Sequence, residues 1–489
     1  MKCLKKIRQL FDELNKSIIY CHWKSNQHFD NALVGVDDLD ILIDRNQYEQ
    51  LIEILGKLSF KHFYIPTVRS YPGIEDWLGF DEETGMIFHL HLHSKLCVGE
   101  KHLKGFCLPI EKAVLKNRVW DEDYKVYFSS PNDELLLLIL RSAMKNRKRD
   151  VLKKSVIGNN SLNEFEWLKK NENEFIKSVS QYNWISERIK KDIEYLYLNG
   201  FKWLTLNKMK HHLYRDLAPY SLGSCFYNTT LRHMHELGRI LLEIRKKYLK
   251  TNYSLLRRRS ATGGVTIAFI GADGSGKSTV IQDINNWLIR VMDVRYFYLG
   301  SGDGKSSFFR FPLIIAKELA IKTKLIKKSN NFTENNSSKN NNSKKRLKFI
   351  QKIWIYALSR ERIHKLLKIS RCRNRGFVVI TDRYPQDEYD GLCDGRRLRN
   401  QKGIAASKET HLFELSKLIQ PDLVIKLVIS PEEAVRRKPK ENDLETSKYL
   451  TDRIKNINFS DYTKKIIINA EKPYEQEIIE IKNQIWMII

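Results

Sequence analysis

VTIAFIGADGSGKST, at residues 265–279, is the stretch of this chain that decides the fold. An unbroken apolar run, Val265–Ile270, leads into a glycine-rich loop that ends in Gly-Lys-Ser, and the residues after the loop can form a helix. This order of strand, loop and helix is the context in which a G-x-x-x-x-G-K-[ST] pattern marks a phosphate-binding loop. Its backbone N–H groups can curl around phosphate oxygens, and the helix N-terminus adds positive potential. The stretch therefore predicts a site for a nucleoside triphosphate.

The residues of this loop have separate expected roles. Lys277 can reach the β- and γ-phosphates, and the Ser278 hydroxyl can ligate Mg²⁺. ATP and Mg²⁺ are accordingly the predicted cofactors. The predicted nucleotide-binding residues are Gly271, Asp273, Gly274, Ser275, Gly276, Lys277, Ser278 and Thr279.

Four further apolar runs follow the loop, at Val294–Tyr298, Phe377–Thr381, Leu423–Ile429 and Ile466–Asn469. Continuous apolar runs are typical of strands buried on both faces of a parallel sheet. Together with Val265–Ile270 and helical crossovers, they predict a doubly wound α/β domain over residues 262–489. Residues 327–345 are rich in Asn, Ser and Lys and nearly without apolar side chains, which predicts a disordered insertion in this domain.

Three segments of this domain, taken together, resemble the thymidylate kinase family of nucleoside monophosphate kinases. The glycine-rich loop contains Asp273, an aspartate that the family places inside its loop. Asp382-Arg383-Tyr384 is similar to the family's Asp-Arg-Tyr signature, and residues 421–434 resemble its fourth strand and following turn. The resemblance implies an ATP-dependent kinase that moves the γ-phosphate of ATP to a nucleoside monophosphate or a related small phosphorylated acceptor.

The resemblance also implies catalytic roles, because phosphoryl transfer depends on positioning and charge neutralisation. Asp382, at a strand end, can hold Mg²⁺ together with Ser278. Arg383 can bind the acceptor phosphate through two parallel hydrogen bonds, a geometry that suits a guanidinium better than a lysine ammonium group. Arg437 belongs to a basic run that lies where the family's lid begins, although a solvated helix face is an alternative for that run. The predicted catalytic residues are Lys277, Asp382, Arg383 and Arg437.

One segment departs from the family pattern. Thymidylate kinases have an Arg-Glu-Pro-Gly-Gly type of segment after the second strand, whereas residues 298–304 read YLGSGDG here. The arginine that would help to hold the monophosphate is absent from this segment. The acceptor therefore need not be dTMP.

The N-terminal region, residues 1–128, contains a second candidate site. Asp38 and Asp40 fall on one side of a predicted strand, Leu39–Ile43, because side chains alternate with period two. Two such carboxylates can bind the metal of a nucleoside triphosphate. The region resembles an uncharacterised bacterial branch of the nucleotidyltransferase superfamily, which implies an α+β fold and a metal held by Asp38 and Asp40. An acidic turn that opens an ordinary strand is the alternative.

The third acid of that superfamily has no obvious counterpart in this sequence. Its place falls on a second predicted strand, Met86–His93, where His91 stands in place of the acid. His89, His91 and His93 share one face of this strand and could instead ligate a metal. The sequence leaves open whether the domain is catalytic or degenerate.

Residues 129–255 are predicted to form a helical domain. Its first helix begins at Ser130–Glu134, where a capping residue, a proline and two acidic residues are typical of a helix N-terminus. Further helices are predicted at Leu162–Val179, Trp184–Leu198 and Asn228–Tyr248.

Composition narrows the function classes. The net charge of +27 is spread over many predicted helices without a nucleic-acid motif, so we expect a small phosphorylated substrate rather than nucleic acid. No apolar run approaches the roughly 20 residues of a membrane span. The seven cysteines lack a C-x-x-C pair, which favours reduced thiols and a cytoplasmic location. A homodimer is left open.

A second function class also stays open. The chain could be a nucleotidyltransferase or nucleotide-binding protein of surface-polysaccharide assembly in which the P-loop domain is regulatory, an analogy based on domain pairing. A polynucleotide kinase is suggested by charge alone.

Overall fold

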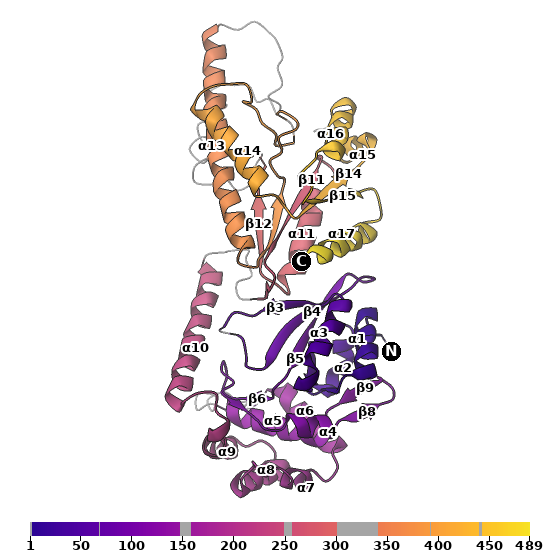
Figure 1. The fold of residues 1–489 in the computed structure, drawn as a ribbon, viewed down its shortest axis with the longest axis vertical. Helices are drawn as coiled ribbons and strands as arrows, with labels where there is room; N and C mark the ends of the chain where they lie inside the picture. The colour runs from indigo at the N-terminus through magenta and orange to yellow at the C-terminus, as the bar shows by residue number, and fades with distance from the viewer. Residues whose placement is uncertain are drawn as a thin grey trace. The chain divides into compact units, whose positions relative to one another are not determined.

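The computed structural model describes residues 2–67, 69–146, 158–248, 257–300, 341–391, 393–439 and 443–489. The chain divides into two compact units, Met1–Ala261 and Thr262–Ile489 (Figure 1). Within the described residues, no helix has the length and hydropathy that a membrane crossing needs.

The N-terminal unit is built on a mixed sheet. Its strands, in spatial order, are β10 (Arg259–Ser260), β3 (Lys61–Tyr64), β4 (Ile74–Asp81), β5 (Met86–His93), β2 (Leu39–Ile43), β1 (Tyr20–His22), β9 (Val126–Phe128) and β8 (Val119–Asp121). A separate pair is formed by β6 (Cys97–Val98) and β7 (Phe106–Cys107). The helices of the sheet region are α1 (Lys5–Ser17), α2 (Phe29–Leu33), α3 (Tyr48–Lys57) and α4 (Glu111–Lys116).

The rest of this unit is helical. Its helices are α5 (Pro131–Lys145), α6 (Asn159–Asn171), α7 (Phe175–Ser180), α8 (Glu187–Asn199), α9 (Trp203–Asp216) and α10 (Cys225–Tyr248). The predicted start of α5 is confirmed, because the Ser130 hydroxyl accepts a hydrogen bond from the backbone N–H of Asp133. The predicted single helix Leu162–Val179 is wrong: Glu174 has φ of 55°, in the left-handed region, and separates α6 from α7.

The structure does not separate residues 1–128 from residues 129–255 as two domains. One hydrophobic core contains Trp23, Leu42 and Leu96 from the sheet region together with the buried leucines of α5. α5 also packs against α6, α7, α8 and α9. Residues 1–128 also have a second core of their own, but the shared core joins the predicted helical domain to the sheet region in one compact unit.

The cysteine prediction is also wrong in part. Cys97 on β6 lies opposite Cys107 on β7, and the two form a disulfide. They are ten residues apart, so only the pairing of two very short strands brings them together.

The C-terminal unit confirms the predicted parallel sheet. Its strand order is β12 (Val294–Tyr298), β13 (Val378–Asp382), β11 (Val265–Gly271), β14 (Leu423–Val428) and β15 (Lys464–Asn469), and every neighbouring pair is parallel. The described helices are α11 (Lys277–Ile289), α13 (Asn341–Arg373), α14 (Ile404–Leu418), α15 (Pro431–Arg437), α16 (Leu444–Asn456) and α17 (Tyr474–Ile488).

The central strand β11 is flanked by β13 on one side and β14 on the other. The order of strands along the chain reverses here, and ligands of such sheets bind at the carboxyl ends of the strands. Of the predicted insertion 327–345, residues 327–340 lie outside the described residues. Residues 341–345 belong to α13, since no glycine or proline interrupts residues 341–373.

Candidate functional site

The glycine-rich loop connects the carboxyl end of β11 to the N-terminus of α11. Gly274 and Gly276 have φ of 90° and 75°, which favours glycine, and Gly276 is the residue before the first turn of α11. A Cβ atom on Gly271 would lie 2.5 Å from the Ser275 hydroxyl. That hydroxyl is buried and has no hydrogen-bond partner among the described residues. The loop therefore has the conformation that its glycines predict, with a buried polar group inside it.

A buried ion pair between Lys277 and Asp382 lies at the foot of this loop. In the register of β11 and β13, Asp382 lies opposite Phe269, two residues before the loop begins. Lys277 Nζ donates to Asp382 Oδ1 at 2.6 Å, and both side chains are only 9% exposed. The Tyr296 hydroxyl donates to the other carboxylate oxygen at 3.5 Å. The structure thus brings together a predicted phosphate ligand and a predicted metal ligand.

Arg383 extends from the end of β13 toward the loop. Its φ is 67°, and its backbone N–H donates to the Phe269 carbonyl, which fixes the turn after the strand. The guanidinium lies 3.5 Å from carboxylate oxygens of both Asp273 and Asp394. Burial lowers the pKa of Arg383, but Asp394 and other negative groups outweigh burial and raise it. The side chain is therefore a positioned, permanently charged group beside the loop.

Residues 298–300 are the described part of the segment that departs from the family pattern, and residues 301–304 lie outside the described residues. A Cβ atom on Gly300 would lie 2.8 Å from Arg383 Cδ. The backbone of this segment therefore contacts Arg383 directly, where the family has a second arginine.

Arg437 contacts the loop from the end of α15. Its Nη1 donates to the Gly274 carbonyl at 3.3 Å and its Nη2 to the Ala470 carbonyl at 3.1 Å. Both Arg437 and its neighbour Arg436 pair with Glu433, but Arg436 does not reach the loop and its side chain is 76% exposed. The basic run is thus divided between one arginine at the loop and one on the solvated face. Asp273, Ser278 and Thr279 are exposed at the mouth of the loop.

The N-terminal unit brings its own candidate residues together. β2 runs parallel to β5 with Asp40 opposite His91, and β4 runs antiparallel to β5 with Asp76 opposite the same histidine. The sequence pattern does not single out Asp76, because the third acid is expected on β5 itself. The stretch Ile74–Asp81 contains several acids, and only the pairing of β4 with β5 singles out Asp76.

Histidine and carboxylate groups alternate across these three strands. His93 Nε2 lies 2.9 Å from Asp40 Oδ1, and His91 Nδ1 lies 3.3 Å from the same oxygen. Burial would raise the pKa of Asp40, but the charge of Lys24 and hydrogen bonds from both histidines hold it well below its usual range. Asp40 is therefore an ionised carboxylate between two imidazoles.

His89 connects the other two acids. Its Nδ1 lies 2.7 Å from Asp38 Oδ1 and its Nε2 lies 2.5 Å from Asp76 Oδ1. Burial would raise the pKa of Asp76, but His89 and Arg258 outweigh burial and lower it to about 2. The second carboxylate oxygen of Asp76 is buried without a hydrogen-bond partner among the described residues.

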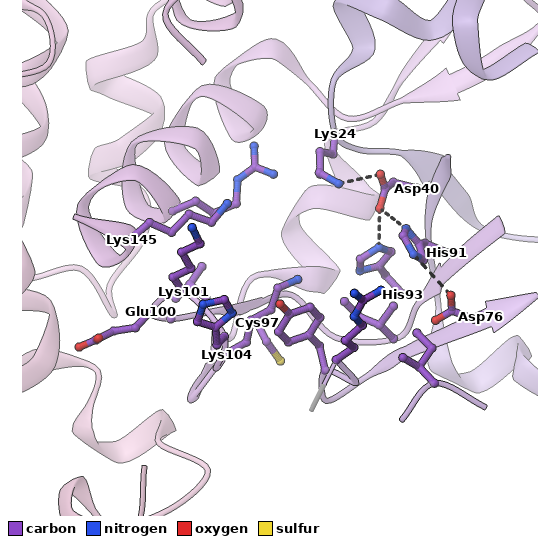
Figure 2. A pocket seen from close by; sticks show the side chains of 18 of the residues that line it. Lys24, Asp40, Asp76, His91, His93, Cys97, Glu100, Lys101, Lys104 and Lys145 are labelled. Carbon is purple, nitrogen blue, oxygen red and sulfur yellow. Dashed lines mark hydrogen bonds and ion pairs between the residues drawn. The ribbon is translucent and has the colours of Figure 1, made fainter. Parts of the chain in front are cut away.

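A cavity of about 460 Å³ opens beside Asp40, His91 and His93 (Figure 2). In this view Lys101, Lys104 and Lys145 lie on one side of the cavity, and the carboxylate and histidines lie on the other. Its basic lining residues are Lys24, Arg69, Lys101, Lys104, Arg141, Lys145 and Arg239. One of these cations also contacts an aromatic ring, because Lys104 Nζ lies 4.6 Å from the centre of the Tyr71 ring.

The lysines of this cavity are crowded. Burial, reinforced by the charges of Lys24 and Arg141, lowers the pKa of Lys104 to about 7. Burial and the same two neighbours lower the pKa of Lys145 to about 8. Several cations that are buried close together repel one another, and such an arrangement is typical of an anion-binding site, because a bound anion offsets their repulsion.

No family model matches the sequence. Two relatives from Escherichia coli are described as uncharacterized ATP-binding proteins. YghR is 27% identical over 236 residues, which are 45% of this chain and 87% of YghR. YghS is 32% identical over 182 residues, which are 35% of this chain and 73% of YghS. A thymidylate kinase from Mycoplasma mobile is 27% identical over 177 residues, which are 36% of this chain and 70% of that enzyme.

A solved structure of deoxyadenosine kinase from M. mycoides with bound dATP covers 45% of this chain and 98% of its own. It is 17% identical to this chain, with a TM-score of 0.25. The relatives support a thymidylate kinase-like P-loop domain in slightly less than half of the chain. They do not support a nucleotidyltransferase-like N-terminal domain.

The crowding of Lys104 predicts a pH dependence of stability. Its pKa is about 7 in the folded protein against 10.5 ordinarily, so the unfolded chain binds more protons between these values. The folded protein consequently loses stability as the pH falls through this window. Lys104→Met removes the loss and should raise the free energy of unfolding at pH 7 by about 1–3 kcal/mol, with a smaller gain at pH 10.

Urea denaturation at several pH values measures this gain. Lys112→Met, at an exposed position of α4, is the matched control and should change stability little at any pH. A Lys104→Met variant as stable as the wild type at both pH values contradicts the proposed crowding.

Proposed function

Because this chain belongs to the same family as YghS of Escherichia coli, we propose that its C-terminal unit is an ATP-dependent kinase of a small phosphorylated acceptor. The observation that carries the proposal is the Lys277–Asp382 pair at the foot of the glycine-rich loop. It places a cation for phosphates and a carboxylate for a metal at the same strand ends. Such a pair, with an arginine beside it, is what phosphoryl transfer requires.

ATP, the phosphoryl donor, would bind along the glycine-rich loop. Backbone N–H groups of residues 271–279 and Lys277 would hold the phosphates of ATP, and Arg437 would stabilise charge on the transferred group. Ser278 and Asp382 offer the oxygen ligands that Mg²⁺ prefers and would hold the ion. Mg²⁺ would supply charge neutralisation on the phosphates.

The acceptor would bind beside Arg383. This guanidinium is charged and tied to the end of β13, and its buried Nε has no hydrogen-bond partner among the described residues. It can therefore hold the phosphate of an acceptor, with Asp273 accepting a hydrogen bond from an acceptor hydroxyl. Since the contacting segment at Gly300 differs from the thymidylate kinase pattern, the acceptor extends beyond dTMP to other small phosphorylated compounds.

Lys277→Ala should lower phosphoryl transfer from ATP on the order of 10²-fold or more, because a positioned charge is lost in a water-poor site. Transfer of label from γ-labelled ATP to a panel of nucleoside monophosphates and sugar phosphates measures the effect. Lys472→Ala, which breaks a half-exposed ion pair with Glu480, is the control and should keep full activity. Undiminished ATP affinity and turnover in Lys277→Ala contradict the assignment of the loop.

Arg383→Lys tests the acceptor site separately. Lysine keeps the charge but cannot form the bidentate hydrogen bonds of a guanidinium. The KM for the acceptor should therefore rise or kcat should fall, while the KM for ATP stays the same. Arg436→Lys, on the solvated face of α15, is the matched control. Steady-state kinetics with the best acceptor of the panel separate the two constants, and equal acceptor kinetics in both variants place the acceptor elsewhere.

A second candidate function, nucleotidyl transfer, applies to the N-terminal unit. It is favoured by one observation: carboxylate oxygens of Asp38, Asp40 and Asp76 all lie within 3.7 Å of the His91 ring nitrogens. Three carboxylates in such a place can hold the metal of a nucleoside triphosphate. In this function the P-loop unit would have a regulatory role.

Asp38→Asn should abolish nucleotidyl transfer without unfolding the chain, because a carboxamide keeps the shape and removes the charge. The neighbouring Asp37→Asn is the matched control, since Asp37 is exposed and its carboxylate accepts a hydrogen bond from Asn31 in the loop before β2. Release of pyrophosphate from labelled nucleoside triphosphates measures the activity. Equal release by both variants rules out Asp38 as a ligand of the reacting nucleotide.

A further inference from the structure

We propose that Asp40, His91 and His93 bind a transition-metal dication such as Mn²⁺, Co²⁺ or Zn²⁺, and that the basic cavity beside them holds an oligophosphate group against it. The proposal concerns the surface of the second candidate function but does not need nucleotidyl transfer. Metal and anion binding are measured without turnover, so either idea can fail while the other stands.

The ligand atoms of this site already converge. One oxygen of Asp40 lies 2.9 Å from His93 Nε2 and 3.3 Å from His91 Nδ1, and all three ligand atoms lie within 4.8 Å of one another. Ligands of a tetrahedral zinc ion, bound at 2.0–2.1 Å, are separated by roughly 3.3 Å. The three atoms can therefore surround one ion with small side-chain movements.

The scaffold keeps these ligands in place. Asp40 and His93 are 5% and 3% exposed, and they lie on the paired strands β2 and β5. The Trp23 ring packs edge-on against His93 with the ring centres 5.0 Å apart. Sites on paired strands hold their geometry better than sites on loops.

The chemistry of the ligands selects the metal. Two imidazoles and one carboxylate suit Mn²⁺, Co²⁺ and Zn²⁺, whereas Mg²⁺ prefers oxygen ligands. A second group, Asp38, His89 and His91, converges in the same way and shares His91 with the first. The carboxylate of Asp76 lies next to this second group: its Oδ1 accepts from Arg258 Nε at 2.6 Å, and its buried Oδ2 has no hydrogen-bond partner among the described residues.

The cavity supplies the second half of the site. Asp40, Asp76, His91 and His93 line it together with the basic residues described above. Lys24 connects the two halves, because it lines the cavity and donates to Asp40 Oδ2 at 2.9 Å. Several cations around one volume of about 460 Å³ match the several charges of an oligophosphate rather than a single carboxylate.

Metal binding is tested on the full chain with Co²⁺, which reports its ligands by visible absorption, and with Zn²⁺ measured by elemental analysis. We expect one ion at this site in the wild type. His91→Gln and His93→Gln should each weaken binding at least 10-fold. His211→Gln, at an exposed position of α9, is the matched control and should bind like the wild type.

Circular dichroism and melting without added metal show that the variants are folded. Mg²⁺ should compete with Co²⁺ only at a large excess. Wild-type protein that does not bind Co²⁺, or binding that His91→Gln and His93→Gln leave unchanged, overturns the metal site. Displacement of Co²⁺ by equimolar Mg²⁺ overturns the proposed selectivity.

Anion binding is tested by calorimetry with inorganic tripolyphosphate on Co²⁺-loaded full chain. A Lys277→Ala background removes the contribution of the P-loop. Lys104→Ala and Lys145→Ala should each weaken binding at least 10-fold, whereas Lys112→Ala should not change it. Equal affinity in all three variants overturns the cavity as the anion site. Tighter binding of ATP than of tripolyphosphate would identify a nucleotide as the source of the phosphates, and equal binding would identify the phosphate chain alone.

Discussion

The C-terminal site depends on the point where β11 and β13 end side by side. Their parallel register places Asp382 next to the start of the glycine-rich loop, and the 2.6 Å ion pair with Lys277 fixes the first turn of α11 against the sheet. Arg383 follows directly and Arg437 reaches the same loop from α15. A shift of one residue between the two strands would turn the carboxylate to the opposite face and separate these groups.

The N-terminal unit uses the same principle with different residues. There the register of β2, β5 and β4 brings Asp40, His91 and Asp76 to one place, next to a cavity lined by cations. In both units the strands position acidic groups that can hold a metal, and basic groups nearby neutralise phosphate. The units differ in the ligands, because imidazoles enter only the N-terminal site. This difference is the physical basis for expecting different metals in the two sites.

The sequence predicted the C-terminal sheet well, because five continuous apolar runs and one loop motif admit few arrangements. It predicted the N-terminal site only in part. Asp40 and the histidines are visible as alternating residues, but Asp76 is one of several acids in a strand that the sequence does not reveal. The crowding of Lys104 and Lys145 could not be predicted either, since these residues meet only through folding. Likewise, the Cys97–Cys107 disulfide depends on two strands of two residues each.

A crystal structure of the full chain with Mg²⁺ and a non-hydrolysable ATP analogue would show whether the loop at Lys277 is the nucleotide site of a kinase. We expect the triphosphate on the backbone of residues 271–279, with Lys277 turned from Asp382 to the β- and γ-phosphates and Asp382 facing the metal. An analogue bound elsewhere, with the Lys277–Asp382 pair unchanged, would mean that the loop is not the nucleotide site.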